Sequence, residues 1–305
     1  MSKPRRLTRE VDGILLLDKP LGLSSNAALQ QVRAIYRAAK AGHAGSLDPL
    51  ASGLLPVCFG QATKVCGRLL NSAKTYRVIA HLGARTASGD CETEVVERAA
   101  VPALSIEQVD TVLASFVGEQ EQVPPMHSAL KFEGKRLYEL ARRGESVERP
   151  ARRIVLHDVK RIGYAGEVLE FDVHCSKGTY VRSLVEDIGV RLGTLAYVAG
   201  LRRLSVDPFG TLPMTTMEEL TGREPADIDA RLLPTDVAFA DLPALELGEN
   251  AEKALLLGQT VEAEDVPPGI ELRAYGAGKR FLGLAERVSD QRVRPLRLFV
   301  SVGSD

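Results

Sequence analysis

The hydrophobic pattern of the first 80 residues alternates between short strand-like runs and a helical stripe. Residues 13–18 (GILLLD) form an apolar run that ends at Lys-Pro and Leu-Gly, which predicts a buried strand followed by a turn. Ser24 or Ser25 can cap the helix that follows. The apolar face of this helix has residues three and four positions apart, namely Leu29, Val32, Ile35, Tyr36 and Ala39. Residues 54–60 (LLPVCFG) predict a second strand, and residues 61–70 predict a helix.

The middle of the chain shows the same kinds of pattern, with alternation that predicts strands and with helical spacing of apolar residues. Alternating apolar and polar residues predict strands at 75–82 (TYRVIAHL) and 168–175, and a further strand is predicted at 153–159. Ser105 and Gln108 form a capping-box pattern, which predicts the start of a helix. After a Ser-Lys-Gly-Thr turn, another helix is predicted from the apolar residues at 181, 184, 185, 188 and 192.

Three segments differ in character from the rest. Residues 118–150 contain glycines, paired prolines and many basic side chains, which predicts an exposed excursion from the core. The region from 218 is acidic and proline-rich, and few helices are expected beyond about residue 232. Short strand-like pieces with glycine turns at 270–300 predict a small β module. Because strands and helices do not alternate strictly, the whole pattern favours an α+β fold with a mixed, largely antiparallel central sheet flanked by helices.

The amino-acid composition is typical of a globular protein and gives no sign of a membrane span or a metal site. Of the 305 residues, 45% are hydrophobic and 26% are charged, as in ordinary globular proteins. No stretch approaches the roughly 20 apolar residues that a membrane span needs. The basic N-terminal residues have no apolar core behind them, so we expect no secretory signal and a cytoplasmic location. The four cysteines and five histidines show neither CxxC nor HExxH spacing, which predicts reduced thiols and no metal site.

The small net charge of −1 hides a strong asymmetry along the chain. Residues 218–271 carry 14 acidic and 3 basic side chains, which leaves 36 basic and 26 acidic side chains elsewhere. Residues 131–161 alone carry 10 basic and 5 acidic side chains. Such segregation is consistent with a polyanionic partner such as nucleic acid, although a charge run is equally well explained as a solvated face.

Glycines surround one acidic residue in the segment Gly42–Gly53 (GHAGSLDPLASG). Glycine lets the backbone turn tightly and lets a ligand approach closely. The segment lacks the Gly-Lys-Ser/Thr ending of a phosphate-binding P-loop, which excludes that motif. Asp48 within it is either a turn or cap residue or a carboxylate nucleophile presented on a rigid loop.

A second candidate segment is residues 176–184 (SKGTYVRSL), where Tyr180 and Arg182 open the predicted helix. Taken singly, Arg182 could be a surface arginine and Tyr180 an ordinary packing residue. Tyr76, on the apolar face of its strand, could likewise belong to the core.

Four blocks of the chain, in order, resemble the tRNA pseudouridine-55 synthase family of bacteria. They are GILLLDKPLGLSS (13–25), GHAGSLDPLASGLLPVCFGQATK (42–64), KTYRV (74–78) and HCSKGTYVRSL (174–184). The resemblance covers nearly the whole chain. It implies a catalytic domain at 1–245 with the pseudouridine synthase fold and an RNA-gripping excursion at about 120–150. It also implies a small PUA-like RNA-binding domain at 246–305.

The resemblance also implies roles for individual residues. Asp48 aligns with the catalytic aspartate, Tyr76 with the tyrosine that stacks on the target base, and Arg182 with the arginine that pairs with the aspartate. The residues implied to contact substrate are His43, which would fill the gap left by the extruded base, together with Tyr76, Tyr180, Leu201, Lys131 and Lys19. One departure is His127 in PPMHSALK, where relatives are expected to have tyrosine.

The implied reaction isomerises one uridine in the T-loop of tRNA, and the protein is expected to act as a monomer without a cofactor. Isomerisation requires a nucleophile, a general base and a closed pocket, but neither a redox group nor an energy source. An arginine beside a buried carboxylate would keep the carboxylate charged. The enzyme could also assist tRNA folding. Two rivals remain: a non-catalytic RNA-binding protein or chaperone, and a nucleosidase that would release free uracil.

Overall fold

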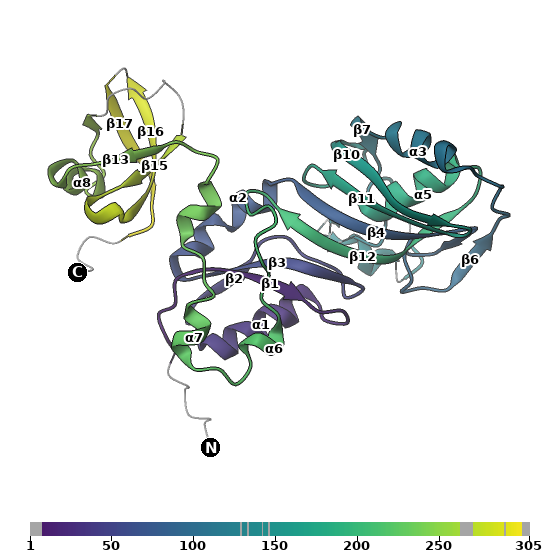
Figure 1. Cartoon of the computed structure of the whole chain (residues 1–305), viewed down its shortest axis with the longest axis horizontal. Helices are drawn as coiled ribbons and strands as arrows, with labels where there is room; N and C mark the ends of the chain where they lie inside the picture. Colours follow the sequence, from purple (N-terminus) through teal and green to yellow (C-terminus); the bar gives the residue numbers. More distant parts are fainter. Residues whose placement is uncertain are drawn as a thin grey trace.

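The structure is a computed structural model that describes residues 8–128, 130–132, 134–141, 143–145, 147–262, 271–289 and 291–300 (Figure 1). For residues 131, 132, 135, 136, 138 and 141 it describes the backbone only. In this part of the chain, no helix is both long and apolar enough to cross a membrane.

The main sheet has eight strands in the order β1-β3-β12-β4-β11-β10-β7, with β2 pairing with β3 at one side (Figure 1). Their bounds are β1 (Gly13–Lys19), β2 (Ala41–His43), β3 (Ala51–Phe59), β4 (Lys74–Leu82), β7 (Gly118–Gln122), β10 (Arg152–Ala165), β11 (Val168–Cys175) and β12 (Ala196–Val206). All neighbouring strands are antiparallel except β3 and β12, which are parallel. The predicted α+β class with a mixed, largely antiparallel sheet is confirmed.

The half of this sheet that contains β1 and β3 is covered on both faces, whereas the half that contains β4, β10, β11 and β12 is covered on one. In β1, Ile14 and Leu16 pack into one hydrophobic cluster while Leu15 and Leu17 pack into another, so both faces of this strand are buried. Helix α1 (Ser25–Tyr36) covers the second of these faces. In the other half, α3 (Ile106–Ala114) and α5 (Val181–Arg191) pack against one face only, over the apolar residues of β4, β10, β11 and β12 (Figure 1).

Local sequence signals set the ends of these helices. The Ser24 hydroxyl accepts a hydrogen bond from the Ala27 N–H at 3.2 Å, as predicted for the first helix cap. That helix ends at Tyr36 because Arg37 adopts the left-handed conformation (φ 51°), which leaves Ala39 beyond it. The predicted capping box of Ser105 and Gln108 is present.

Shorter elements connect these layers. Between β3 and β4 lie a 3₁₀ turn (Gly60–Val65) and α2 (Cys66–Asn71), and a small sheet pairs β5 (Ala84–Thr86) with β6 (Val95–Arg98). A hairpin of β8 (Lys131–Phe132) and β9 (Lys135–Arg136) precedes α4 (Leu137–Ala141). Beyond the main sheet come α6 (Met217–Leu220), α7 (Pro225–Asp229) and a second 3₁₀ turn (Thr235–Phe239).

The C-terminal part forms a separate five-stranded sheet in the order β13-β15-β16-β17-β14 (Figure 1). Its elements are β13 (Ala244–Glu246), α8 (Glu249–Leu256), β14 (Val261–Glu262), β15 (Glu271–Tyr275), β16 (Phe281–Ser289) and β17 (Arg292–Leu298), with a 3₁₀ turn at Ala277–Lys279. It has its own hydrophobic cluster. Phe281 and Phe299 also pack against Phe239, with ring centroids 6.0 and 5.7 Å away, which joins this sheet to the rest of the chain.

Several elements differ from the sequence-based expectations. Within the segment Gly42–Gly53, residues 42–43 belong to β2 and residues 51–53 belong to β3, so the loop is shorter than the segment and spans residues 44–50. Residues 118–122 form the edge strand β7, so the excursion begins later than predicted. Helix α8 lies in a region expected to have few helices; it begins with two acidic residues in its first turn, which favour a helix N-terminus. The central strand β12 was not predicted, because two arginines and a glycine obscure its pattern.

Strand β12 approaches β3 closely at Gly53, and this contact gives a test of the packing. Its φ is +96°, and a Cβ there would lie 2.2 Å from the Arg203 carbonyl oxygen. We predict that Gly53→Ala lowers the free energy of unfolding by on the order of 3 kcal/mol, measured by urea denaturation.

The matched control is Gly67→Ala in α2, where a Cβ would meet nothing within 4 Å. This variant should change the free energy of unfolding by at most about 1 kcal/mol. Equal unfolding curves for the two variants would contradict the close approach of β12 to β3.

Candidate active site

Residues 44–50 form a loop that presents Asp48 at the junction of the two halves of the main sheet. The buried Ser25 fixes this loop, because its hydroxyl accepts from the Leu47 N–H at 2.7 Å and donates to the Leu47 carbonyl at 3.0 Å. The Gly22 N–H donates to the Pro49 carbonyl at 2.8 Å. The loop backbone is thereby held on both sides of Asp48, while the side chain of Asp48 stays 54% exposed.

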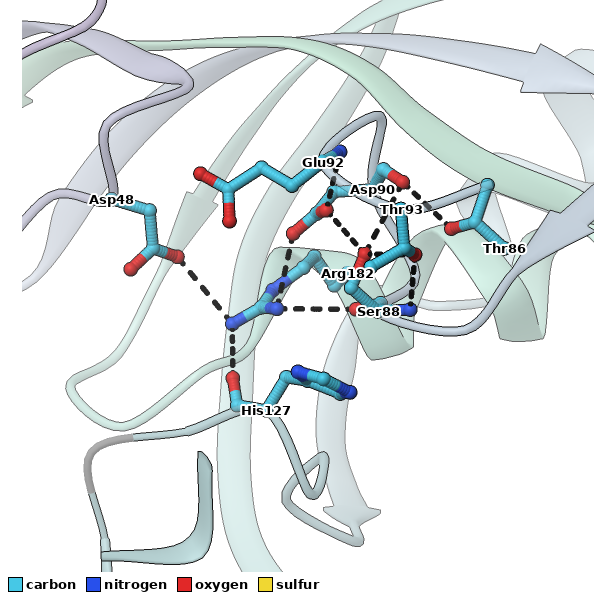
Figure 2. Close-up of polar contacts among 8 residues, drawn as sticks. All are labelled: Asp48, Thr86, Ser88, Asp90, Glu92, Thr93, His127 and Arg182. Carbon is cyan, nitrogen blue, oxygen red and sulfur yellow. Dashed lines mark hydrogen bonds and ion pairs between the residues drawn. The ribbon is translucent and has the colours of Figure 1, made fainter. Parts of the chain in front are cut away.

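Arg182 faces this carboxylate from the first turn of α5. Figure 2 shows its guanidinium between Asp48 on one side and Asp90 on the other. The Arg182 Nη2 lies 3.4 Å from the Asp48 Oδ2, and Nη1 lies 3.0 Å from the Asp90 Oδ2. Nη1 also donates to the Ser88 carbonyl at 3.1 Å, and Nη2 donates to the His127 carbonyl at 2.6 Å. Only 12% of the Arg182 side chain is exposed, so these contacts fix its position.

Asp90 is wholly buried in the loop between β5 and β6, and it is itself held by hydrogen bonds (Figure 2). Its Oδ1 accepts from the Ser88 hydroxyl and from the Glu92 N–H, which leaves Oδ2 for the arginine. The Thr86 hydroxyl donates to the Asp90 carbonyl at 2.7 Å. Asp90 was not predicted from the sequence. Its local pattern, TASGDCET, shows only an aspartate after a glycine among small polar residues, and in the structure that glycine has a φ of +76°.

Tyr76 and Leu201 lie on the face of the sheet that α5 covers. Both are partly buried and pack against the same hydrophobic cluster, which Leu50 of the Asp48 loop also joins. Burial raises the pKa of the Tyr76 phenol, and a nearby arginine, Arg203, opposes that effect. The site therefore combines an exposed carboxylate, a fixed guanidinium and an apolar surface that includes one aromatic ring.

His43 and Tyr180 lie at the edges of this group of site residues. His43 ends β2, and burial, followed by the charge of Arg203, lowers the pKa of its imidazole, so the ring is neutral at pH 7. Its Nδ1 has no hydrogen-bond partner among the described residues. Tyr180 caps α5 and is joined to Gln122 through its backbone, with its N–H donating at 2.7 Å and its carbonyl accepting at 3.0 Å.

The two predicted substrate-binding lysines, Lys19 and Lys131, are placed differently from the other predicted site residues. Lys19 is 0% exposed, and its ammonium donates to the carbonyls of Pro20 at 2.9 Å and Leu23 at 2.6 Å. It therefore offers no surface to a ligand in this structure and instead closes the turn before α1. Lys131 lies in β8, and its side chain is outside the described part.

Lys74 is a further buried cation beneath the Asp48 loop. Its ammonium donates to the Ser72 carbonyl at 2.6 Å and to the Leu69 and Leu70 carbonyls at 3.2 Å, at the C-terminal end of α2. Burial, and then the charge of Arg203, lowers the pKa of Lys74 to about 8. Among the residues with described positions, no cluster of three or more His, Cys, Asp or Glu side chains could hold a metal ion.

The fold of this chain is similar to that of proteins in two solved complexes. The chain covers 86% of a protein in "Structure of H/ACA RNP bound to a substrate RNA containing 2'-deoxyuridine", with a TM-score of 0.73 and 22% identity over 95% of its own length. It covers 85% of a protein in "Crystal Structure of a Cbf5-Nop10-Gar1 Complex", with a TM-score of 0.72 and 24% identity. At these identities the likeness shows the fold alone.

Sequence comparison then defines the family. Residues 33–181 match "TruB family pseudouridylate synthase (N terminal domain)", residues 182–240 "tRNA pseudouridylate synthase B C-terminal domain", and residues 243–299 "Pseudouridine synthase II TruB, C-terminal". The tRNA pseudouridine synthase B of Chromohalobacter salexigens is 48% identical over 98% of this chain and 97% of its own. That of Nitrosococcus oceani is 46% identical over 99% of both. The chain belongs to the TruB family of pseudouridylate synthases and is an enzyme of that family.

The lowered pKa of Lys74 predicts how stability depends on pH. In the unfolded chain the lysine keeps its ordinary pKa near 10.5, so between pH 8 and 10.5 the unfolded state holds a proton that the folded state has lost. The free energy of unfolding therefore rises with pH through this window. From pH 7 to pH 10, wild type should gain about 2 kcal/mol relative to Lys74→Met, measured by urea denaturation at both pH values.

Comparison with Lys74→Met cancels the titration of other groups, because they are present in both proteins. The same pH dependence in wild type and variant would show that Lys74 keeps an ordinary pKa in the folded state.

Proposed function

We propose that this enzyme converts uridine 55 in the T-loop of tRNA to pseudouridine, with Asp48 as the nucleophile. The observation that carries the proposal is the pair of an exposed carboxylate and a buried, fixed arginine, 3.4 Å apart on different elements. Relatives named tRNA pseudouridine synthase B, nearly half identical over almost the whole chain, support tRNA as the substrate.

The proposed chemistry uses the chain's own side chains. The Asp48 carboxylate attacks either the ribose C1′ or the uracil C6, and the glycosidic C–N bond breaks. The uracil then rotates, its C5 forms the new bond to the ribose C1′, and the bond to Asp48 breaks to restore the carboxylate. The C5 proton leaves to a base, and N1 gains a proton. Atoms and electrons balance without an oxidant or a cofactor. Arg182 keeps the carboxylate aimed at the substrate, since Asp90 and two carbonyls hold the guanidinium in place.

Reaching the uridine requires flipping it out of the stacked T-loop, which costs a few kcal/mol. Stacking on Tyr76, worth about 1–3 kcal/mol, offsets much of that cost. Leu201 packs on the same apolar cluster as Tyr76 and would contact the extruded base there. We propose that His43, whose neutral ring lies at the end of β2, fills the gap left in the RNA. Tyr180, at the start of α5, would line the same pocket.

The surrounding surface would hold the tRNA by its shape and its phosphates. We propose that residues 1–245 form the catalytic domain, with an RNA-gripping segment at about 120–150 that includes Lys131. Residues 246–305 would form a PUA-like RNA-binding domain, supported by the separate five-stranded sheet. A monomer is sufficient for this proposal. An enzyme that opens the tRNA elbow would also give a misfolded elbow the chance to refold.

The direct test is Asp48→Asn on an unmodified tRNA transcript, followed by nucleoside analysis. The change keeps the size of the side chain and removes the nucleophile. We expect turnover to fall by at least about 10⁴-fold, while tRNA affinity stays within about threefold of wild type. A transcript with cytidine at position 55 should yield no pseudouridine from the wild-type enzyme.

Asp110→Asn is the matched control, because Asp110 also pairs with an arginine, Arg161, but on the surface at 2.6 Å. It should keep wild-type turnover. Pseudouridine formation by Asp48→Asn within tenfold of wild type would reject the nucleophile, and release of free uracil would identify a nucleosidase instead.

A further inference from the structure

The turn between β1 and α1 exposes a leucine beside the loop that carries Asp48. Leu21 is 66% exposed, which is among the highest exposures of large hydrophobic side chains in the described ranges. A single exposed apolar side chain is normal on a protein surface and needs no explanation by itself. What distinguishes Leu21 is its position next to the proposed nucleophile.

One backbone hydrogen bond joins this turn to the Asp48 loop. The Gly22 N–H donates to the Pro49 carbonyl at 2.8 Å. Leu21 and Asp48 are each one residue away from that bonded pair, so two Cα–Cα steps of about 3.8 Å and one hydrogen bond connect them. Leu21, Asp48 and Pro49 are all exposed. A ligand that is bound at Asp48 and is larger than a single base would therefore also reach Leu21.

Hydrogen bonds hold the turn, so that Leu21 is presented in one place. The Lys19 ammonium donates to the Pro20 carbonyl at 2.9 Å and to the Leu23 carbonyl at 2.6 Å, on either side of Leu21 in the sequence. Gly22 completes the turn with a φ of +82°, a conformation that glycine adopts without strain. A side chain on such a preorganised turn loses little conformational freedom when it binds a ligand.

An apolar side chain in this place fits an unstacked nucleobase. Proteins that distort nucleic acids place leucine and other apolar side chains against bases that have lost a stacking neighbour. Flipping a uridine toward Asp48 takes a stacking neighbour away from the nucleotides on both sides of it. The buried Lys19 ammonium adds a positive charge to the same turn, which favours a polyanion such as RNA.

We propose that Leu21 binds the face of a nucleobase next to the flipped uridine and so stabilises the RNA conformation in which the uridine reaches Asp48. This inference rests on the proposed function, because it assumes that a uridine is flipped toward Asp48. It adds a contact that the site residues described above do not provide. His43 would fill the gap left by the extruded base, whereas Leu21 would cover a base beside that gap.

The test compares Leu21→Ala with wild type on three RNAs. One is an intact T-loop stem-loop, and the other two each lack one base, on the 5′ side or the 3′ side of the target uridine. An abasic position keeps the phosphates and removes the face that Leu21 would contact.

On the intact RNA we expect Leu21→Ala to lower kcat/KM by roughly 5- to 10-fold, because the lost methyl groups no longer shield the base from water. On at least one of the two abasic RNAs the same variant should lower kcat/KM by less than about twofold, since the contact is already gone. An RNA without measurable turnover is compared by its Kd instead.

Val190→Ala is the matched control. Val190 is 68% exposed, but it lies in the last turn of α5, whereas Arg182 lies in the first. This variant should leave kcat/KM within about twofold of wild type on all three RNAs. Because both side chains are exposed, neither variant should shift the urea midpoint of unfolding measurably.

Two results would overturn the inference. One is a kcat/KM for Leu21→Ala within about twofold of wild type on the intact RNA. The other is a larger loss that persists on both abasic RNAs, which would place the effect in the enzyme rather than in a contact with a base. Neither result bears on the proposed function, which conversion of the uridine by wild type and its loss in Asp48→Asn test independently.

Discussion

One guanidinium joins the parts of this molecule on which the proposed chemistry depends. Arg182 projects from α5 and contacts Asp48, from the loop between β2 and β3, and Asp90, from the loop between β5 and β6. Buried Asp90 neutralises the arginine and fixes its direction, while exposed Asp48 is left as the group that faces solvent. An arginine held only by the reacting carboxylate would have other rotamers to adopt, and the two backbone carbonyls remove that freedom.

The buried charged side chains near the pair of Asp48 and Arg182 are mainly positive. Lys19, Lys74 and Arg203 are all buried near the Asp48 loop, and within the described ranges none of them forms an ion pair with a carboxylate. Each is satisfied by backbone carbonyls instead. Such uncompensated positive charge is costly to bury, but it suits a site whose proposed substrate is a polyanion.

Much of the fold and part of the site could be predicted from the sequence. Strand β1, the cap of α1 at Ser24 and the capping box at Ser105 follow from local patterns, because local interactions determine them. The side chains of Asp48 and Arg182 were singled out by their segments and by family resemblance, and the structure brings them together.

The rest could not be predicted because it depends on contacts between distant segments. Strand β12 carries two adjacent arginines, which local pattern cannot assign to a central strand; their partners, Asp18 and Gly45, lie more than 150 residues away. Asp90 could not be predicted for the same reason, because its burial depends on contacts with α5 and with the loop that holds it. The burial of Lys19 likewise depends on a turn that its own ammonium closes.

Asp90→Asn is the decisive test of whether Asp90 holds Arg182 against Asp48. The amide keeps the size of the side chain and removes the charge that faces Arg182. The single-turnover rate on a tRNA transcript should fall by on the order of 10²-fold, with tRNA Kd within about threefold of wild type. Asp172→Asn, which weakens the partly exposed pair with Arg77 at 2.9 Å, should leave the rate unchanged. If Asp90→Asn has the same rate as Asp172→Asn, Asp90 is not needed to hold Arg182 against Asp48.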